Sequence, residues 1–140
     1  MSDVMPHLKL SHGGAFKILQ AAIAKAKAMG VPQCIAIVDD GGHLLAFTRM
    51  DGGKVLSIDS CIKKAMTAAS SRVPTGGAGA DVELKLAHAT DGKLTNLKGG
   101  VPIVVDGHVI GAVGVGSGTG EQDLEVAKAG IAALPGAKAW

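Results

Sequence analysis

Residues 114–120, Gly-Val-Gly-Ser-Gly-Thr-Gly, form a glycine-rich turn that leads into a predicted helix. Such a turn offers free backbone N–H groups and the positive end of the helix dipole to an anion. We therefore expect it to hold a small carboxylate or another anionic group. The predicted ligand-binding residues of this turn are Gly116, Ser117, Gly118, Thr119 and Gln122. Alternatively, the glycines serve close packing of a strand against a helix.

A nucleotide is a poor match for the same turn. The segment has no Lys-Ser/Thr pair of a P-loop, and it lacks a third glycine at the spacing of a dinucleotide fingerprint. The strand before it also belongs to a predicted tight hairpin and not to a parallel crossover. These differences favour a small anion over a nucleotide.

Ionisable residues elsewhere in the chain could act together with this turn. We predict Lys64 and Asp123 as a candidate acid and base, although the helix dipole also favours Asp123 without any function. Arg49 and Arg72 are candidate clamps for a carboxylate, and His43 is a further candidate ligand-binding residue. Each of these side chains could instead be simply solvated. Because the spacing reveals no catalytic triad or paired carboxylates, enzymatic activity stays open.

The histidines and cysteines do not show the spacing of a metal site. The five histidines include no pair at metal-ligand spacing on one helix, so we predict no local metal site. His43 and His108 each follow a predicted hairpin turn, where exposure is usual and axial ligation of heme is the alternative. Cys34 and Cys61 are too few for a disulfide framework, and we expect two buried, reduced thiols.

The composition excludes several classes of partner. The net charge of +2 is spread along the chain, and only 2% of the residues are aromatic, which disfavours binding of nucleic acid. No stretch approaches the length of a membrane span, and the N-terminus does not resemble an export signal. We therefore expect a cytoplasmic protein without a membrane partner. The 47% hydrophobic content, mostly of small aliphatic residues, predicts a closely packed core.

The hydrophobic periodicity and the turn residues predict an α/β protein. An Asp-Gly pair at residues 106–107 between β-branched residues is a strong hairpin signal, and a related turn lies at residues 39–42. The helices and the glycine-rich loop at residues 73–80 complete an α/β/α sandwich with a central antiparallel sheet, in a single domain of residues 1–140. We expect that loop to be mobile. The predicted elements are helix 11–29, hairpin 34–47, helix 55–71, short helix 81–89, hairpin 101–115 and helix 121–134.

Motifs spread along nearly the whole chain resemble the GlcG/HbpS family, which includes the C-terminal domain of PduO-type proteins. The resemblance is most specific from residue 99 to residue 123. The residues that carry it are Ile37-Val38-Asp39, Gly41-Gly42-His43-Leu44-Leu45-Ala46, Arg49-Met50-Asp51-Gly52, Lys64-Ala65, Thr67-Ala68, and Gly99-Gly100-Val101-Pro102-Ile103-Val104 through Gln122-Asp123.

This resemblance implies a profilin-like or PAS-like fold and assembly into dimers or larger homo-oligomers. It also implies heme as a possible cofactor and an association with catabolism of small molecules. Two features depart from the family pattern: the chain has no export signal, and residues 114–119 read Gly-Val-Gly-Ser-Gly-Thr where the family's turn resembles Gly-Val-Ser-Gly-Gly-Thr. The resemblance therefore assigns no heme ligand to a particular residue.

The sequence is compatible with three functions. The first is a cytoplasmic, homo-oligomeric protein that binds heme or a small organic ligand between the glycine turn and the region from Arg49 to Arg72. The second is a small catabolic enzyme of the lyase, isomerase or hydrolase type that acts on a carboxylate or hydroxy-carbonyl substrate. The third is a structural assembly protein without a ligand.

Overall fold

The two predicted hairpins form and join into one sheet in the computed structural model, which describes residues 2–140. The first hairpin consists of β1 (Cys34–Asp39) and β2 (Leu44–Arg49), and the second of β3 (Gly100–Val105) and β4 (His108–Gly116). The four strands lie in the order β2-β1-β4-β3, and every neighbouring pair is antiparallel. The predicted central antiparallel sheet is therefore confirmed.

The Asp106-Gly107 turn has the backbone conformation that its sequence predicts. Asp106 has a φ of 50° and Gly107 a φ of 78°, so both central residues lie in the left-handed region. This conformation matches the right-handed twist of the flanking strands, and Asp-Gly is among the few pairs that adopt it easily. The local sequence thus fixes how β3 and β4 meet.

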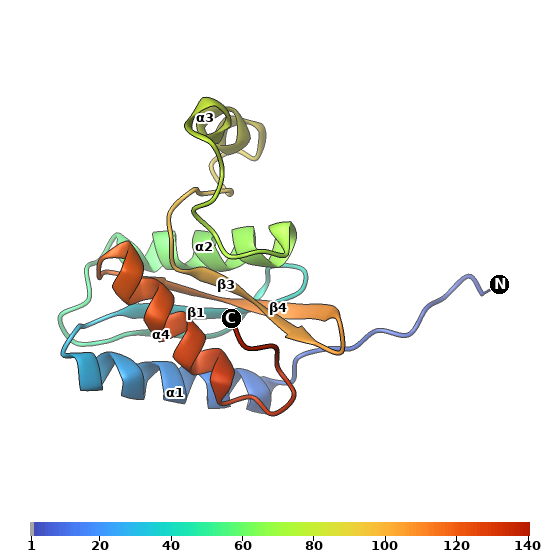
Figure 1. Ribbon diagram of the computed structural model, residues 1–140, viewed down its shortest axis with the longest axis horizontal. Helices are drawn as coiled ribbons and strands as arrows, with labels where there is room; N and C mark the ends of the chain where they lie inside the picture. The colour runs from blue at the N-terminus through green and yellow to red at the C-terminus, as the bar shows by residue number, and fades with distance from the viewer. Residues whose placement is uncertain (1) are drawn as a thin grey trace.

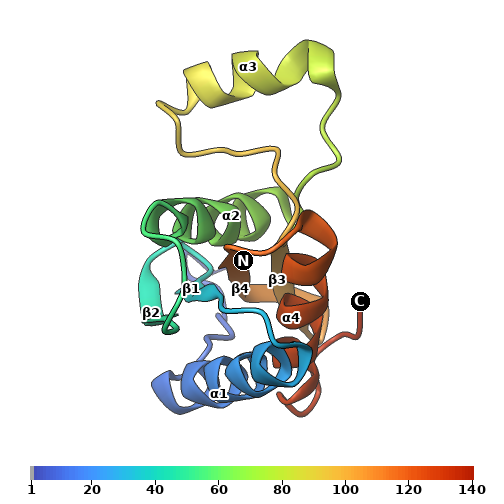
Figure 2. The same ribbon diagram turned by 90° about the vertical axis from the view of Figure 1, so that its left-hand side faces the viewer.

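Helices cover both faces of the sheet, as Figures 1 and 2 show. One face carries α1 (His12–Met29) over β1 and β2 and α4 (Gly120–Ala132) over β3 and β4, and these two helices pack against each other. The opposite face carries α2 (Ser57–Ser71), which packs on β1, β3 and β4. The predicted α/β/α sandwich is confirmed.

The strands send alternate side chains into two different cores. Ile35 and Ile37 of β1 point toward α1 and α4, while Ala36 and Val38 point toward α2. The core under α2 is built from small residues, and it brings the helix close to the strands. A Cβ atom at Gly114 would overlap the carbonyl oxygen of Cys61, so close packing of helix and strand requires this glycine.

The ends of the helices follow local signals. The Ser11 side chain accepts a hydrogen bond from the Gly14 N–H at 3.0 Å, and Gly30 ends α1 with a φ of 69°. The last helix is shorter than predicted, because α4 ends at Ala132 and a turn follows before Pro135. Within residues 2–140, no helix is both long and apolar enough to cross a membrane.

The short helix α3 (Ala80–Ala89) stands away from the sandwich, as both views show. None of its ten residues is buried. Hydrogen bonds within residues 78–96 hold the two ends of this segment together. The Asn96 side-chain amide donates to the Ala78 carbonyl and to the Glu83 carboxylate, both at 2.8 Å. The helix is therefore a projection of the molecule and not part of its core.

Candidate functional site

Lys64 and Asp123, the predicted acid and base, form a buried ion pair. Lys64 lies in the middle of α2 and Asp123 in the first turn of α4, and the fold brings Lys64 Nζ to 2.9 Å from Asp123 Oδ2. Their side chains are only 5% and 3% exposed. The alternative that Lys64 is simply solvated was wrong: the lysine is buried, and a carboxylate compensates its charge.

Neighbouring polar groups satisfy both members of the pair. The Lys64 ammonium also donates to the Val115 carbonyl at 2.8 Å, and Asp123 Oδ1 accepts from the Gly118 N–H at 3.0 Å. With its amide oriented to donate, Gln33 hydrogen bonds with Asp123 Oδ1 at 3.0 Å and with the Gly116 carbonyl. Such hydrogen bonds offset the cost of removing two charges from water.

The ion pair lies against a pocket of about 240 Å³ that we call the Lys64 pocket. The pocket lies between the first turn of α2, the glycine turn and the start of α4. Ser117 closes one side, since its hydroxyl oxygen accepts a hydrogen bond from the Lys54 N–H at 2.7 Å. The lining residues are Lys54, Ser57, Ser60, Lys64, Leu97, Lys98, Ser117, Gly118, Gly120 and Asp123.

The residues of the glycine turn divide between structural and pocket positions. Thr119 and Gln122 form a capping box, in which the Gln122 N–H donates to Thr119 Oγ1 and the Thr119 N–H donates to Gln122 Oε1. Gly116 packs against the start of α2. Ser117, with a φ of 93°, and Gly118 line the Lys64 pocket. A Cβ at Gly118 would lie 2.7 Å from Gln33 Nε2 and 2.9 Å from Asp123 Oδ1, so a larger residue would have to displace these side chains.

The other predicted ligand-binding residues lie elsewhere. His43 follows the β1–β2 turn, its side chain is 82% exposed, and its Nδ1 lies 3.3 Å from Asp39 Oδ1. Arg49 ends β2 at the same sheet end as the glycine turn, since Cys34 pairs with Arg49 on one side and with Gly116 on the other. Arg49 is exposed and does not line the Lys64 pocket.

Arg72 ends α2 with a φ of 65°, at the opposite end of the helix from the Lys64 pocket. It lines a separate polar pocket of about 280 Å³ together with His7, His108 and Asp40. His108 is exposed, as its position after a turn predicts. The structure therefore does not bring Arg49, Arg72 and His43 into one site with the glycine turn.

The surroundings of Asp39 and of the two cysteine thiols shift the pKa values of these groups. Partial burial of Asp39 raises its pKa, but hydrogen bonds from the His43 and Gly41 N–H groups outweigh this and lower the pKa below its ordinary value. Burial raises the pKa of the Cys61 thiol to about 12, and burial also raises the pKa of Cys34. Both cysteines are buried and free, as predicted, so neither thiol is a reactive nucleophile.

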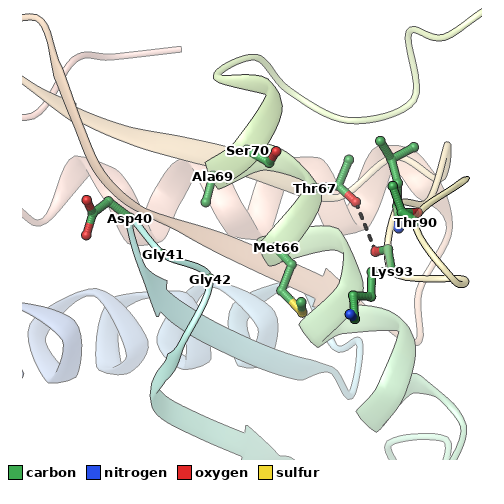
Figure 3. A pocket seen from close by; sticks show the side chains of 10 residues that line it. Asp40, Gly41, Gly42, Met66, Thr67, Ala69, Ser70, Thr90 and Lys93 are labelled. Carbon is green, nitrogen blue, oxygen red and sulfur yellow. Dashed lines mark hydrogen bonds between the residues drawn. The ribbon is translucent and has the colours of Figure 1, made fainter. Parts of the chain in front are cut away.

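A second pocket, of about 330 Å³, lies between the β1–β2 turn, α2 and the segment after α3 (Figure 3). We call it the Met66 pocket. Its lining residues are Asp40, Gly41, Gly42, Met66, Thr67, Ala69, Ser70, Thr90, Lys93 and Leu94. Figure 3 shows the Met66 and Lys93 side chains extending from neighbouring walls toward the same opening.

Both threonine hydroxyls of the Met66 pocket are used within the protein. Thr67 Oγ1 donates to the Lys93 carbonyl at 3.5 Å and accepts from the Thr95 N–H at 3.0 Å. Thr90 Oγ1 donates to the Leu86 carbonyl at 2.9 Å and accepts from the Leu94 N–H at 2.9 Å. The walls therefore present mainly methyl, methylene and thioether groups. The sequence analysis missed this pocket, because its walls come from three segments without a shared motif.

The fold and these two pockets define a small α/β/α protein with ligand-sized openings on either side of α2. The chain matches the family model described as "Haem degrading protein HbpS-like" over residues 10–132. Protein GlcG of Escherichia coli (strain K12) is 45% identical over 107 residues, which cover 76% of this chain and 80% of GlcG. The chain therefore belongs to the HbpS-like family.

Solved structures agree with this assignment. Protein ORFY of Klebsiella pneumoniae superposes with a TM-score of 0.87 at 27% identity and covers 96% of each chain. A crystal structure of a PduOC:heme complex superposes with a TM-score of 0.86 at 29% identity, over 94% of this chain and 98% of that chain. Relatives with the same fold thus include a domain crystallised with heme.

Proposed function

We propose that the protein binds heme, and that the Met66 pocket receives it. The observation that carries this proposal is the chemistry of the pocket walls: an apolar surface, a thioether and an ammonium group at one opening. The family membership and the heme complex of PduOC support the choice of ligand. The proposal deepens the sequence-based expectation of a heme or small-ligand binder, and it moves the site away from the glycine turn.

The residues of the Met66 pocket fit a porphyrin in three respects. Gly41 and Gly42 carry no side chains, so the part of the β1–β2 turn that follows Asp40 leaves room for a flat ring. Met66 offers a soft sulfur ligand to iron, and Lys93 offers a cation to a propionate. At about 330 Å³ the pocket is near the lower end of ligand-sized cavities, so part of the ring would extend beyond it.

Bound heme would supply an iron centre whose reactivity depends on its axial ligand and on the polarity of its surroundings. The protein's own contribution would be to exclude water from one face of the ring. His43 is the alternative axial ligand, because it lies next to Gly42 in the sequence. Its ring does not line the pocket, and its Nδ1 faces Asp39.

A hemin titration followed by absorbance tests this proposal. We expect the unmodified protein to give a saturable shift of the Soret band. Met66→Leu, which keeps the side-chain volume, should change the band position, while His43→Ala should not. Lys93→Gln should weaken binding several-fold, whereas Lys85→Gln on the exposed α3 is the matched control. The absence of a Soret shift in the unmodified protein would refute heme binding, and a changed band only in His43→Ala would move the ligand to the turn.

We also propose that the protein is a homo-oligomer. The apolar side chains that α3 exposes, among them Val82 and Leu84, support this prediction, because burying them against another copy would be favourable. Sedimentation velocity tests it, and a monomer at high concentration would contradict it. The cytoplasmic location and the association with small-molecule catabolism stay predictions.

A further inference from the structure

The two edges of the sheet differ in how they are protected. β3 forms one edge, and the end of the chain lies along it. The Lys138 N–H donates to the Val104 carbonyl at 2.8 Å. Trp140 Nε1 donates to the Pro102 carbonyl at 2.8 Å, and Pro102 itself has no N–H group to offer another strand. Covering segments and prolines prevent pairing at a sheet edge, so the β3 edge is protected against a further strand.

β2 forms the other edge, and it has none of these protections. Its six residues, 44–49, include no proline, and the one charged residue among them, Arg49, stands at the end of the strand. Within residues 2–140, no loop hydrogen bonds with the backbone of this strand. Figure 2 shows β2 and the C-terminal segment on opposite sides of the sheet. The β2 edge thus presents unused backbone donors and acceptors, which are a template for pairing with another strand.

The outward backbone groups of β2 belong to particular residues. The Met50 N–H donates to the Gln33 carbonyl at 2.9 Å, so Met50 bonds toward the β1 side. In antiparallel pairs, residues that bond to the neighbouring strand alternate with residues that bond away from it. The pairing of β1 with β2 is regular from Arg49 to Ala46. Phe47 and Arg49 therefore direct their N–H and carbonyl groups away from the sheet.

Phe47 adds an apolar surface beside these backbone groups. Its side chain packs against the core under α2, as do Ile58 and Ile62 of that helix, and all three side chains stay half-buried. The helix lies over β1, β3 and β4, which leaves the β2 side of this face partly open. A strand added at the β2 edge would remove this apolar surface from water, which is favourable.

The charges along the β2 edge identify a second copy of the chain as the partner. Arg49 is exposed at one end of the strand, and it makes no ion pair within the part of the chain that the structure describes. The turn at the other end carries Asp40, whose side chain is 35% exposed and contacts His7. Antiparallel pairing of two identical strands brings each Arg49 toward the acidic turn of the other copy. Both ends of the contact are then complementary in charge.

We propose that two copies of this chain pair antiparallel through β2 about a two-fold axis, which joins their four-stranded sheets into one continuous sheet. The inference rests on the proposed homo-oligomer and assigns its interface. With the axis at Phe47, the two Phe47 residues exchange N–H···O=C hydrogen bonds, and their rings lie on the same face. Such a contact is isologous, because the same residues serve both copies. Neither the Met66 pocket nor the Lys64 pocket is lined by Phe47 or Arg49, so heme binding is tested separately.

Amide hydrogen exchange, read together with sedimentation velocity of the unmodified protein, tests the interface. We expect a dimer, or an assembly of dimers, in which the Phe47 amide is protected. The Thr48 amide bonds toward β1 and should be protected in any folded state. An oligomer with a rapidly exchanging Phe47 amide would overturn the β2 interface and leave the homo-oligomer intact. A monomer at high concentration would refute both, and a protected Phe47 amide in that monomer would mean that a segment of the same chain covers the edge.

A pair of lysine variants locates the contact. Phe47→Lys sets two ammonium groups opposite each other at the axis, and we expect the dimer dissociation constant to rise about a hundredfold. Leu84→Lys, on the exposed α3, is the matched control and should leave the dimer unchanged. Loss of the dimer in Leu84→Lys but not in Phe47→Lys would move the interface to α3 and overturn the proposal.

An exchange of charges tests the orientation without altering a half-buried side chain. Arg49→Glu, at an exposed position, should weaken the dimer about tenfold, because it places a second acidic group near the turn of the other copy. Asp40→Arg added to Arg49→Glu should restore most of the affinity, since opposite charges then meet again. No recovery in the folded double variant would refute the antiparallel arrangement.

Discussion

The Lys64 pocket and the Met66 pocket lie against the same helix but use their polar groups in opposite ways. In the Met66 pocket the hydroxyls of Thr67 and Thr90 bind backbone groups of the protein, which leaves an apolar surface. In the Lys64 pocket the ionised side chains of Lys64 and Asp123 lie beside the serines that line the opening. The residue types alone do not reveal this difference. The hydrogen bonds that each hydroxyl already makes determine what kind of ligand each pocket can accept.

The largest effect should come from breaking the ion pair beside the Lys64 pocket. Asp123→Ala leaves the Lys64 ammonium buried without its carboxylate, and we expect a loss of about 3–5 kcal/mol in the free energy of unfolding. Urea denaturation measures this loss. The exposed Lys25–Glu125 pair, at 3.4 Å, is the matched control: Glu125→Ala should cost less than about 1 kcal/mol.

A double variant separates the charge effect from the packing effect. Lys64→Met combined with Asp123→Leu removes both charges and should recover most of the stability that Asp123→Ala loses. Equal losses of stability in Asp123→Ala and Glu125→Ala would contradict the buried ion pair.

A smaller loss of stability should follow from a substitution that moves α2, the helix that both pockets share, away from the sheet. At Gly114 an added methyl group meets the Cys61 carbonyl, so we expect Gly114→Ala to lower the free energy of unfolding by about 1–3 kcal/mol. Gly77→Ala is the control, since nothing lies within 4 Å of its added Cβ. Thermal unfolding with both variants measures the difference. Equal losses of stability in Gly114→Ala and Gly77→Ala would contradict the close packing of α2 on β4.

The smallest effect should come from the β1–β2 turn beside the Met66 pocket and should depend on pH. The N–H groups of His43 and Gly41 lower the pKa of Asp39 in the folded protein relative to the unfolded chain. The ionised carboxylate therefore contributes stability above its unfolded pKa, and this contribution is lost as the pH falls through the folded pKa. Asp39→Asn should flatten the acid side of the stability profile and weaken hemin binding slightly. An unchanged acid profile in Asp39→Asn would contradict this role.

Much of the fold follows from local sequence. The Asp-Gly turn at residues 106–107 forms as predicted. The Ser11 cap and the Gly30 end of α1 also act within a few residues. The short side chains of the α2 core are also visible in the composition. The bounds of α2 and α4 differ from prediction by at most two residues at either end, because helix ends depend on weak local signals.

The site was only partly predictable from the sequence. Lys64 and Asp123 stand out as ionisable residues at the ends or borders of apolar elements, but their contact joins segments 59 residues apart. Gln33, which completes the network around Asp123, carries no local signal at all. The same holds for Met66 and Lys93, which become neighbours because the chain returns to α2 after α3.

The sequence by itself determined the strands, the helices and the chemical types available to a site. The tertiary structure alone decided which of those groups meet, which hydroxyls are already satisfied, and that Arg49 and Arg72 lie at opposite ends of the molecule's α2 face. The physical reason is the distance along the chain over which each interaction acts. Turn and capping preferences act between residues close in the chain, whereas charge compensation and pocket formation depend on packing between segments that only the folded sheet brings together.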